Sequence, residues 1–234
     1  MKHEEKLNEI ARLYDPSKDF DGYLLRLNFR TMMPFIKGKT CLEVGCARGM
    51  STLLLTNLFE TVHVVEPSRF NIEAARKKVG KRAVFFHSFC ETFSPPIRYD
   101  AIFLLRLLEH LENPVAALRR VKTWLNPDGL IHIIVPNATS LHRRIGVYMG
   151  MLESLHSFSE RDRKFGHRCV YDFNTLQQDI EKAELRVLHK EGVFLKPLPN
   201  AQLMSWKQEI LDALYAVGKE VPELCAEIYM VAAL

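Results

Sequence analysis

The sequence predicts an α/β fold: a Rossmann-like, doubly wound, mainly parallel sheet of seven strands with helical cap insertions. Three observations predict it. From residue 40, short apolar runs alternate with amphipathic helical stretches, which is typical of a parallel sheet covered by helices on both faces. A glycine-rich turn follows the first apolar run. The 234 residues, 47% hydrophobic and 26% charged, suit one globular domain with a sizeable core, so we expect residues 1–234 to form a single domain.

Residues 1–36 are expected to form N-terminal helices. Apolar side chains recur near helical spacing over 2–13 and 22–33, and Pro34 closes the second stretch. The core that follows, 40–136, contains five expected strands and three expected helices. The strands cover 40–44, 61–65, 83–86, 100–105 and 130–135, and the helices cover 51–58, 68–79 and 113–124. A turn at 126–129 is expected to lead into the fifth strand.

The alternation breaks after residue 136. No strand is evident over 137–171. Further on, the pattern predicts helices at 173–183 and 202–216 and strands at 185–193 and 226–233. Long insertions in compact domains are usually functional or disordered, and these segments hold too many apolar residues for disorder. We therefore expect 137–171 and 197–222 to cover the sheet as cap segments.

Composition narrows the class of protein. The longest apolar runs are too short to cross a bilayer, and the charged N-terminus shows no signal peptide. The five cysteines form no C-x-x-C pair, which disfavours a disulfide framework and a zinc site and suits a reducing compartment. We expect a cytoplasmic protein without a membrane span. The sequence leaves its oligomeric state open.

The glycine-rich turn spans 42–49, at the end of the first expected strand. Glycine lets the backbone turn tightly and approach a ligand closely. A dinucleotide fold uses G-x-G-x-x-G to seat a pyrophosphate, whereas this chain has E-x-G-x-x-x-G, with Glu43 two residues before Gly45. S-adenosylmethionine has no pyrophosphate and carries an ammonium and a sulfonium, so an acid is expected there. Glu43 would act through water or by fixing the loop.

Glu66 ends the second expected strand, 21 residues after Gly45. A carboxylate at this place can accept hydrogen bonds from both ribose hydroxyls of an adenosyl group. The turn and this acid, in register with alternating strands and helices, together predict S-adenosylmethionine as the cofactor and S-adenosylhomocysteine as the product.

Four segments, LEVGCARG, VVEPS, YDAIFLLRLLEHLENP and LNPDGLIHIIVPN, resemble the successive motifs of class I S-adenosylmethionine-dependent methyltransferases. The resemblance covers roughly residues 40–193. LEHLENP is similar to the small-molecule branch that includes ubiquinone-biosynthesis O-methyltransferases, and GHRCVYD and GVFLKPLPNAQ also look like bacterial methyltransferases. The resemblance implies methylation of a small molecule, at oxygen or nitrogen.

The resemblance also implies roles for the turns that follow the strands. Gly45 and Gly49 would let the backbone approach the methionine part of the cofactor, and Glu66 would hold the ribose. Adenine would lie near the turns after the second and third strands, and the cofactor would run along the end of the fourth. The other implied cofactor contacts are Glu43, Cys46, Ala47, Pro67, Ser68, Phe89, Cys90, Leu105 and Arg106.

One departure from the resemblance concerns metals. In the ubiquinone enzymes that the chain resembles, the pattern at the end of the fourth strand is similar to E-x-x-E-H, a set suited to a metal. Here Arg106 stands in place of the first acid, ahead of Glu109 and His110. A cation at that position disfavours a divalent metal, so we expect a site without a metal, and catechol chemistry is disfavoured as well.

Candidate catalytic residues lie near the same edge of the sheet. Methyl transfer is an in-line displacement in which the protein supplies alignment and sometimes a base, for which histidine is suited. His110 follows the fourth strand and His142 follows the fifth, so both are candidates, with a structural role as the alternative. His167, in the cap, is a third histidine that could reach the acceptor.

Positive charge gathers in the same cap segment. Residues 137–170 carry most of the net charge of +4, because they contain six basic residues and three acidic ones. Arg143 and Arg144 follow the fifth strand closely, and arginines match carboxylate and phosphate oxygens. We therefore expect them to contact an anionic acceptor. The alternative is a solvated charged face.

Three other functions stay open. A nicotinamide-dependent oxidoreductase is disfavoured because the third glycine of its motif is missing. A nucleic-acid methyltransferase is motivated by the pI of 8.8 and the basic cap, but no N-P-P-Y-type base-flipping motif occurs, so we expect a small-molecule partner rather than nucleic acid. A non-catalytic domain that binds the cofactor as a sensor or scaffold would carry the same glycine motif.

Overall fold

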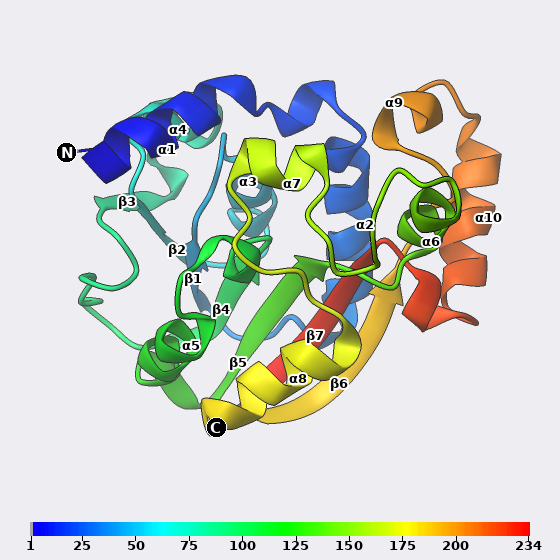
Figure 1. Cartoon of the computed structure of the whole chain (residues 1–234). Coiled ribbons are helices and arrows are strands. Elements are labelled where there is room, and N and C mark those ends of the chain that lie inside the picture. The colour runs from blue at the N-terminus through cyan, green and yellow to red at the C-terminus, as the bar shows by residue number, and fades with distance from the viewer. Residues whose placement is uncertain (1) are drawn as a thin grey trace.

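A seven-stranded sheet in the order β3-β2-β1-β4-β5-β7-β6 runs through the centre of the molecule (Figure 1). The structure is a computed structural model that describes residues 2–234, except for the side chains of residues 2, 3 and 6. The first five strands are parallel, and β7 pairs antiparallel with both β5 and β6. The predicted fold class is confirmed. The strands are β1 (Thr40–Val44), β2 (Thr61–Glu66), β3 (Val84–His87), β4 (Tyr99–Leu105), β5 (Leu125–Pro136), β6 (Arg186–Val193) and β7 (Glu227–Ala233).

Helices cover both faces of the sheet. Alternate residues of each strand enter two hydrophobic clusters; in β4, Phe103 belongs to one and Leu104 to the other. Burial of both strand faces explains the nearly continuous apolar runs of the sequence. The first cluster includes residues of α2, α3, α4 and α10, and the second includes residues of α5 and α8. These helices are α2 (Asp21–Met32), α3 (Met50–Leu55), α4 (Arg69–Val79), α5 (Pro114–Lys122), α8 (Phe173–Lys182) and α10 (Gln208–Gly218).

The start of β5 differs from the prediction. The strand begins at Leu125 instead of 130, so the expected turn at 126–129 lies within it. Tyr99 pairs with Leu125 and Ala101 with Leu130, which makes the segment between them a bulge. A Cβ on Gly129 would lie 2.9 Å from the Tyr99 carbonyl oxygen, so only glycine fits this close approach.

The cap consists of short helices above the carboxyl ends of the parallel strands. Figure 1 shows α7 beyond the tip of β5, with α1 beside it over α4. The segment 137–171 forms two helices and no strand, as predicted, with a single bridge between Asn137 and Tyr171. The helices at these strand ends are α6 (Leu141–Tyr148), α7 (Glu160–Phe165) and α9 (Asn200–Leu203) from the expected cap segments and α1 (Lys2–Leu13) from the N-terminal helices. Helix α10, also within 197–222, packs instead on one face of the sheet.

The lengths and hydropathies of the helices bear on membrane insertion. Within residues 2–234, none combines the length and the apolar character that a membrane span requires.

Candidate active site

A large cavity lies where the parallel strands end. Its volume is about 740 Å³, within the range of small-molecule sites. The turns after β1, β2 and β4 form its floor, and residues of α1, α2 and α7 and of the loop after α7 form its walls. Open α/β sheets bind ligands at this edge. The cavity therefore brings together most of the residues that the sequence singled out.

The turn after β1 reaches the cavity through three residues, Gly45, Cys46 and Ala47. Gly45 has a φ of 78°, in the left-handed region that favours glycine, and its amide donates to the carbonyl of Val65 at 2.9 Å. Gly49 does not line the cavity. A Cβ on it would lie 2.6 Å from the Cβ of Ala75 in α4, and its φ is 76°. Close packing of α3 against α4 and the left-handed backbone both require this glycine.

Glu43 fixes this turn from below. Its carboxylate is fully buried and accepts hydrogen bonds from the hydroxyls of Ser51 and Thr52, in the first turn of α3. It does not line the cavity, so of the two expected modes of action the structure shows the fixing of the loop. Burial raises the pKa of Glu43 to about 7, although both hydroxyl hydrogen bonds lower it.

Glu66 lines the cavity at the end of β2, next to Pro67 and Ser68. One carboxylate oxygen accepts from the backbone amide of Cys46 at 2.9 Å, and the other accepts from the amide of Ser68 at 2.9 Å and the side chain of Asn71 at 3.3 Å. These bonds hold the carboxylate between the two turns that the cofactor would span. The oxygen that faces Cys46 keeps a lone pair for a ribose hydroxyl, so the residues present fit an adenosyl group.

Phe89 and Cys90 were expected beside adenine. Neither lines the cavity. Cys90 is buried in the hydrophobic cluster of α5 and α8, and its carbonyl accepts from Arg120 at 3.0 Å. The turn after β3 does not reach the cavity, whose lining near Glu66 includes Pro67, Ser68 and Asn71.

At the end of β4, Leu105 and Arg106 line the cavity as expected. Arg106 has a φ of 56°, which is strained for a residue with a side chain. Its guanidinium lies 3.1 Å from Asp21 of α2 and 3.2 Å from Glu227 of β7. These two ion pairs hold the strained residue in place and tie the end of β4 to the wall of the cavity.

Asp21 is the centre of a polar network that the sequence did not reveal. Tyr14 donates to it at 3.0 Å, and Arg161 of α7 and Asn200 of α9 each contact it at 2.8 Å. Burial alone would raise the pKa of Asp21, but Arg106 and Arg161 outweigh burial and hold it below its ordinary value. One carboxylate thus joins the sheet edge to α7 and α9 of the cap and to the segment after α1.

The histidines meet the cavity in different ways. His110, His142 and His167 all line it. Burial lowers the pKa of His110 to about 3, and burial with the nearby Lys196 holds the pKa of His142 well below its ordinary value. Both are therefore neutral near pH 7. The Nδ1 of His142 is buried without a hydrogen-bond partner among the described residues, so it is available to a ligand.

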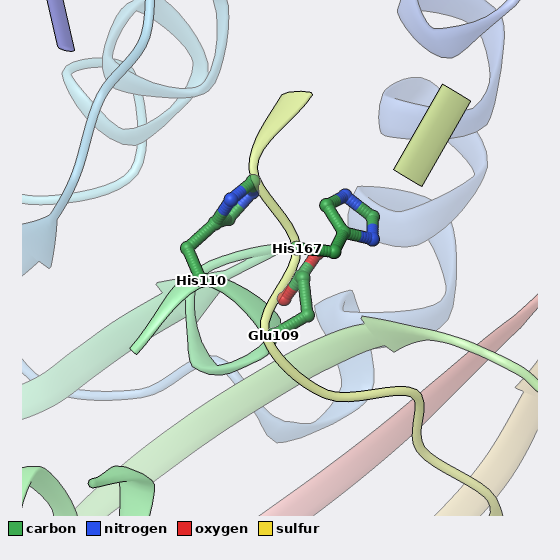
Figure 2. A group of neighbouring side chains, drawn as sticks. All are labelled: Glu109, His110 and His167. Carbon is green, nitrogen blue, oxygen red and sulfur yellow. The ribbon is translucent and has the colours of Figure 1, made fainter. Parts of the chain in front are cut away.

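Glu109, His110 and His167 form a cluster that sequence reasoning missed. Each offers one ligand-type atom, and these atoms all lie within 4.8 Å of one another. Figure 2 shows the Glu109 carboxylate near both imidazoles, with His167 arriving from the cap. The Glu109–His110 pair was visible in the sequence, but nothing there indicated that His167, 57 positions further on, would join it.

Arg143 holds the cap together. Its side chain is buried, donates to the carbonyls of Leu155 and Ser157, and forms an ion pair with Asp162 at 3.0 Å. Every nitrogen of this guanidinium has a protein partner, so Arg143 holds the loop between α6 and α7, and it also lines the cavity. Arg144 donates to the carbonyl of Thr139 and is not among the cavity residues.

Comparison with known proteins gives a family match. Residues 18–190 match the family described as "Methyltransferase domain". The chain is 22% identical over 213 residues to the ubiquinone biosynthesis O-methyltransferase of Paraburkholderia phytofirmans, covering 86% of this chain and 90% of that one. It is 28% identical over 102 residues to (S)-coclaurine N-methyltransferase of Thalictrum flavum subsp. glaucum, covering 41% of this chain but only 28% of that enzyme's length.

The fold also matches solved structures. One is the 1,6-didemethyltoxoflavin-N1-methyltransferase of Burkholderia thailandensis, with 1,6-didemethyltoxoflavin and S-adenosylhomocysteine bound. The TM-score is 0.59 at 14% identity, over 91% of this chain and 78% of that one. The glycine turn, the acid at the end of β2 and the family match over residues 18–190 lead to one conclusion. The chain belongs to the methyltransferase-domain family and is a class I S-adenosylmethionine-dependent methyltransferase.

Proposed function

We propose that this enzyme methylates a small, polar acceptor at oxygen or nitrogen, with the acceptor in the cap half of the cavity. The observation that carries the proposal is the continuity of the cavity. It runs without a break from Glu66, at the cofactor end, to His142 and Lys196 under the cap. A cavity of about 740 Å³ suits a cofactor together with a small molecule rather than a nucleic-acid strand.

The polar lining of the cap half supports a polar acceptor. Lys196 donates to Asn200 at 2.5 Å, and burial lowers the pKa of Lys196 to about 8. Buried polar groups such as the Nδ1 of His142 favour a ligand that completes their hydrogen bonds. The charge of the cavity lining does not favour an anionic acceptor, because carboxylates and cations both line the cavity. The carboxylates are Asp21, Glu66, Glu109, Asp162 and Glu227, and the cations are Arg106, Arg143, Arg161, Arg163, Arg168 and Lys196.

Methyl transfer requires little from the protein except the alignment of the two reactants. The acceptor oxygen or nitrogen attacks the methyl carbon, the bond from that carbon to sulfur breaks, and S-adenosylhomocysteine leaves while the acceptor gives up a proton. The protein holds the two reactants in line. We assign contacts with the acceptor to His142, through its free Nδ1, and to the His110 side of the cavity. The low pKa of His110 makes its imidazole a weak base, so its role is positioning.

Two further points belong to the proposal. The five cysteines are free thiols, which supports a reducing compartment such as the cytoplasm. The names of the relatives, an O-methyltransferase of ubiquinone biosynthesis and an N-methyltransferase of coclaurine, support a small organic acceptor.

A turnover assay tests the proposal. The protein is incubated with S-adenosylmethionine and either a panel of small hydroxyl and amine compounds or total RNA and DNA, and S-adenosylhomocysteine is measured. We expect turnover with members of the small-molecule panel, and Glu66→Ala should need a higher concentration of S-adenosylmethionine to reach it. Turnover with nucleic acid alone would contradict the proposal. Cofactor binding without turnover on any panel would support a sensor or scaffold instead.

A further inference from the structure

Lys196, in the cap half of the cavity, is a buried amine whose hydrogen-bond partner is neutral. The residue is 9% exposed and lines the cavity. Among the described residues, its Nζ donates one hydrogen bond, to the side-chain oxygen of Asn200 at 2.5 Å, and forms no ion pair. Lysine is almost never this buried unless a carboxylate pairs with it, because a buried ammonium without a counter-ion is costly. This exception indicates a functional amine.

Asn200 fixes the direction of the amine. Its side-chain nitrogen donates to Asp19 and to Asp21, each at 2.8 Å. Carboxylates accept hydrogen bonds, so Asn200 must turn its nitrogen toward the two acids and its oxygen toward Lys196. The backbone of Lys196 is held as well, because its carbonyl accepts from the amide of His142 at 3.1 Å. Nζ is thus held in place by one neutral group, and its other hydrogen-bonding positions are left for a ligand.

Charges of both signs act on Lys196 from the surrounding elements. Asp21 of α2 and Glu227 of β7 favour the ammonium, whereas Arg106, after β4, and Arg161 of α7 oppose it. These acids form ion pairs with these arginines, so their effects on the amine oppose one another. Burial is the largest effect, and it lowers the pKa of Lys196 to about 8. A sizeable fraction of the amine is therefore neutral near pH 7.

The two candidate histidines are poorer bases than this amine. The pKa of His110 is about 3, and that of His142, next to Lys196 on α6, is well below its ordinary value. Both imidazoles are neutral near pH 7 and bind a proton weakly, whereas a base is most effective when its pKa is near the working pH. Glu109 is the rival base, because burial raises the pKa of its carboxyl to about 7.

Lys196 lies on the acceptor side of the sheet. The cofactor would run over the ends of β1, β2 and β4, and the sheet continues from there in the order β4-β5-β7-β6. Lys196 follows β6 by three residues and lines the cavity together with Pro136, at the end of β5, and Glu227, at the start of β7. The amine is thus on the part of the sheet edge that lies beyond the cofactor.

We propose that Lys196 contacts the attacked oxygen or nitrogen of the acceptor and takes its proton. The neutral amine donates one N–H to Asn200 and keeps its lone pair for the acceptor. As the acceptor atom bonds to the methyl carbon, the carbon–sulfur bond breaks, its electron pair stays on sulfur, and the proton of the acceptor moves to Nζ, which later releases it to water. The acceptor is accordingly a hydroxyl or amine compound whose attacked atom carries a proton. The inference rests on the proposed function, because it assigns the base of that reaction.

Competitive labelling examines the amine directly and needs no acceptor. The full chain is treated with trace acetic anhydride between pH 6.5 and 10.5, and peptide mass spectrometry measures the acetylation of each lysine. We expect Lys196 to reach half of its full reactivity near pH 8, against 10.5 for an ordinary lysine. Lys190 is the reference, because it also bonds a neutral amide, Gln177 at 3.3 Å, but is exposed and does not line the cavity. Half-reactivity of Lys196 near 10.5, or no reaction at any pH, would overturn the inference.

Kinetics with those panel compounds that the parent turns over separate a base from a charge. Lys196→Met removes the amine, and we expect kcat to fall about 100-fold or more while S-adenosylhomocysteine binds as before. Lys196→Arg supplies a cation that keeps its proton, and we expect it to be as slow. In the parent, kcat/KM should rise as the pH passes 8, and this rise should vanish in both variants. Lys190→Met is the matched control and should behave like the parent.

The other results have distinct meanings once circular dichroism shows that each variant is folded. If Lys196→Arg recovers the parent rate, the residue acts by charge alone and the inference is overturned. It is also overturned if Glu109→Gln, and not Lys196→Met, removes the rise with pH, because Glu109 is then the base. If the parent turns over no panel compound, the proposed function fails. Labelling would still support a basic amine in the cavity with a midpoint near pH 8, and would overturn it with one near 10.5.

Discussion

The Arg106 guanidinium, at the end of β4, lies 3.1 Å from the Asp21 carboxylate at the start of α2. Asp21 also accepts from Arg161 of α7 at 2.8 Å, so one buried acid connects the sheet edge, an N-terminal helix and the cap. Because Arg106 has a left-handed φ of 56°, this connection also holds a strained backbone at the cavity floor. The cap is therefore fixed to the sheet at the point where the two substrates would meet.

Asp21→Asn tests this connection. The change leaves two arginines short of a partner in a buried network, which should lower the free energy of unfolding by about 3 kcal/mol. Urea denaturation measures it. Asp212→Asn is the control, because Asp212 pairs with Arg30 on the exposed surface at 3.5 Å and should cost less than about 1 kcal/mol. Equal losses in the two variants would contradict the central place given to Asp21.

Arg143 is expected to act on stability rather than on the acceptor. Arg143→Ala removes the ion pair with Asp162 and the hydrogen bonds to Leu155 and Ser157, which should cost about 3–5 kcal/mol in unfolding experiments. Arg144→Ala, which loses one hydrogen bond to Thr139, should cost about 1 kcal/mol. If Arg143→Ala folds as stably as the parent and instead raises only the KM for the acceptor, the original expectation of an anion contact is restored.

Glu43 makes stability depend on pH. Its folded-state pKa of about 7 is above its ordinary value of 4.5, so the folded state binds the proton more tightly than the unfolded chain. Burying Glu43 therefore costs least stability below pH 4.5, where the carboxyl is protonated in both states. As the pH rises from 4.5 to 7, this group lowers the free energy of unfolding by about 3 kcal/mol. Glu43→Gln mimics the protonated form and should remove this fall.

The difference between parent and Glu43→Gln isolates this effect. The buried histidines His110, His132 and His142 have lowered pKa values and act in the opposite direction, losing stability as the pH falls below 6.5. Their contributions are common to both proteins and cancel. Denaturation at several pH values between 4.5 and 7.5 gives the difference, and a difference that does not change with pH would show that Glu43 keeps an ordinary pKa.

Local patterns in the sequence predicted the sheet and the cofactor end of the site. Short apolar runs and the glycine turn are local features, and they placed β1, β2 and β4 and brought Gly45 and Glu66 to one edge. The same reasoning put a turn at 126–129, because the sequence of a bulge that packs against Tyr99 looks like that of a free turn. Asn126 instead donates to Asp100 at 2.7 Å inside the sheet.

The cap end of the site could not be predicted in the same way. The contacts of Asp21 with Arg106 and Arg161 join positions 85 and 140 residues apart, and no periodicity signals them. Arg143 looked available in sequence, because its partners Asp162 and Leu155 come into reach only when the loop after α6 folds back. Phe89 and Cys90 were assigned by resemblance alone, and the cavity does not reach them.

Glu66→Ala tests the ribose contact. Glu66 lies in the cavity wall with its oxygens aimed by the amides of Cys46 and Ser68, and its loss leaves polar groups of protein and cofactor unpaired. We expect S-adenosylhomocysteine to bind about 1–3 kcal/mol more weakly in calorimetry. Glu60→Ala, in the exposed ion pair with Lys39, is the control and should bind normally. Unchanged affinity in Glu66→Ala would place the ribose elsewhere.

The central claim is that the cavity holds S-adenosylmethionine, and one measurement tests it most directly. Isothermal titration calorimetry of the full chain compares S-adenosylhomocysteine with NAD under identical conditions. The turn E-x-G-x-x-x-G lacks the third glycine of a dinucleotide site, and the cavity floor combines Gly45 with Glu66. We predict saturable binding of S-adenosylhomocysteine at one site per chain and no measurable binding of NAD. Tight binding of NAD with no response to S-adenosylhomocysteine would contradict the account.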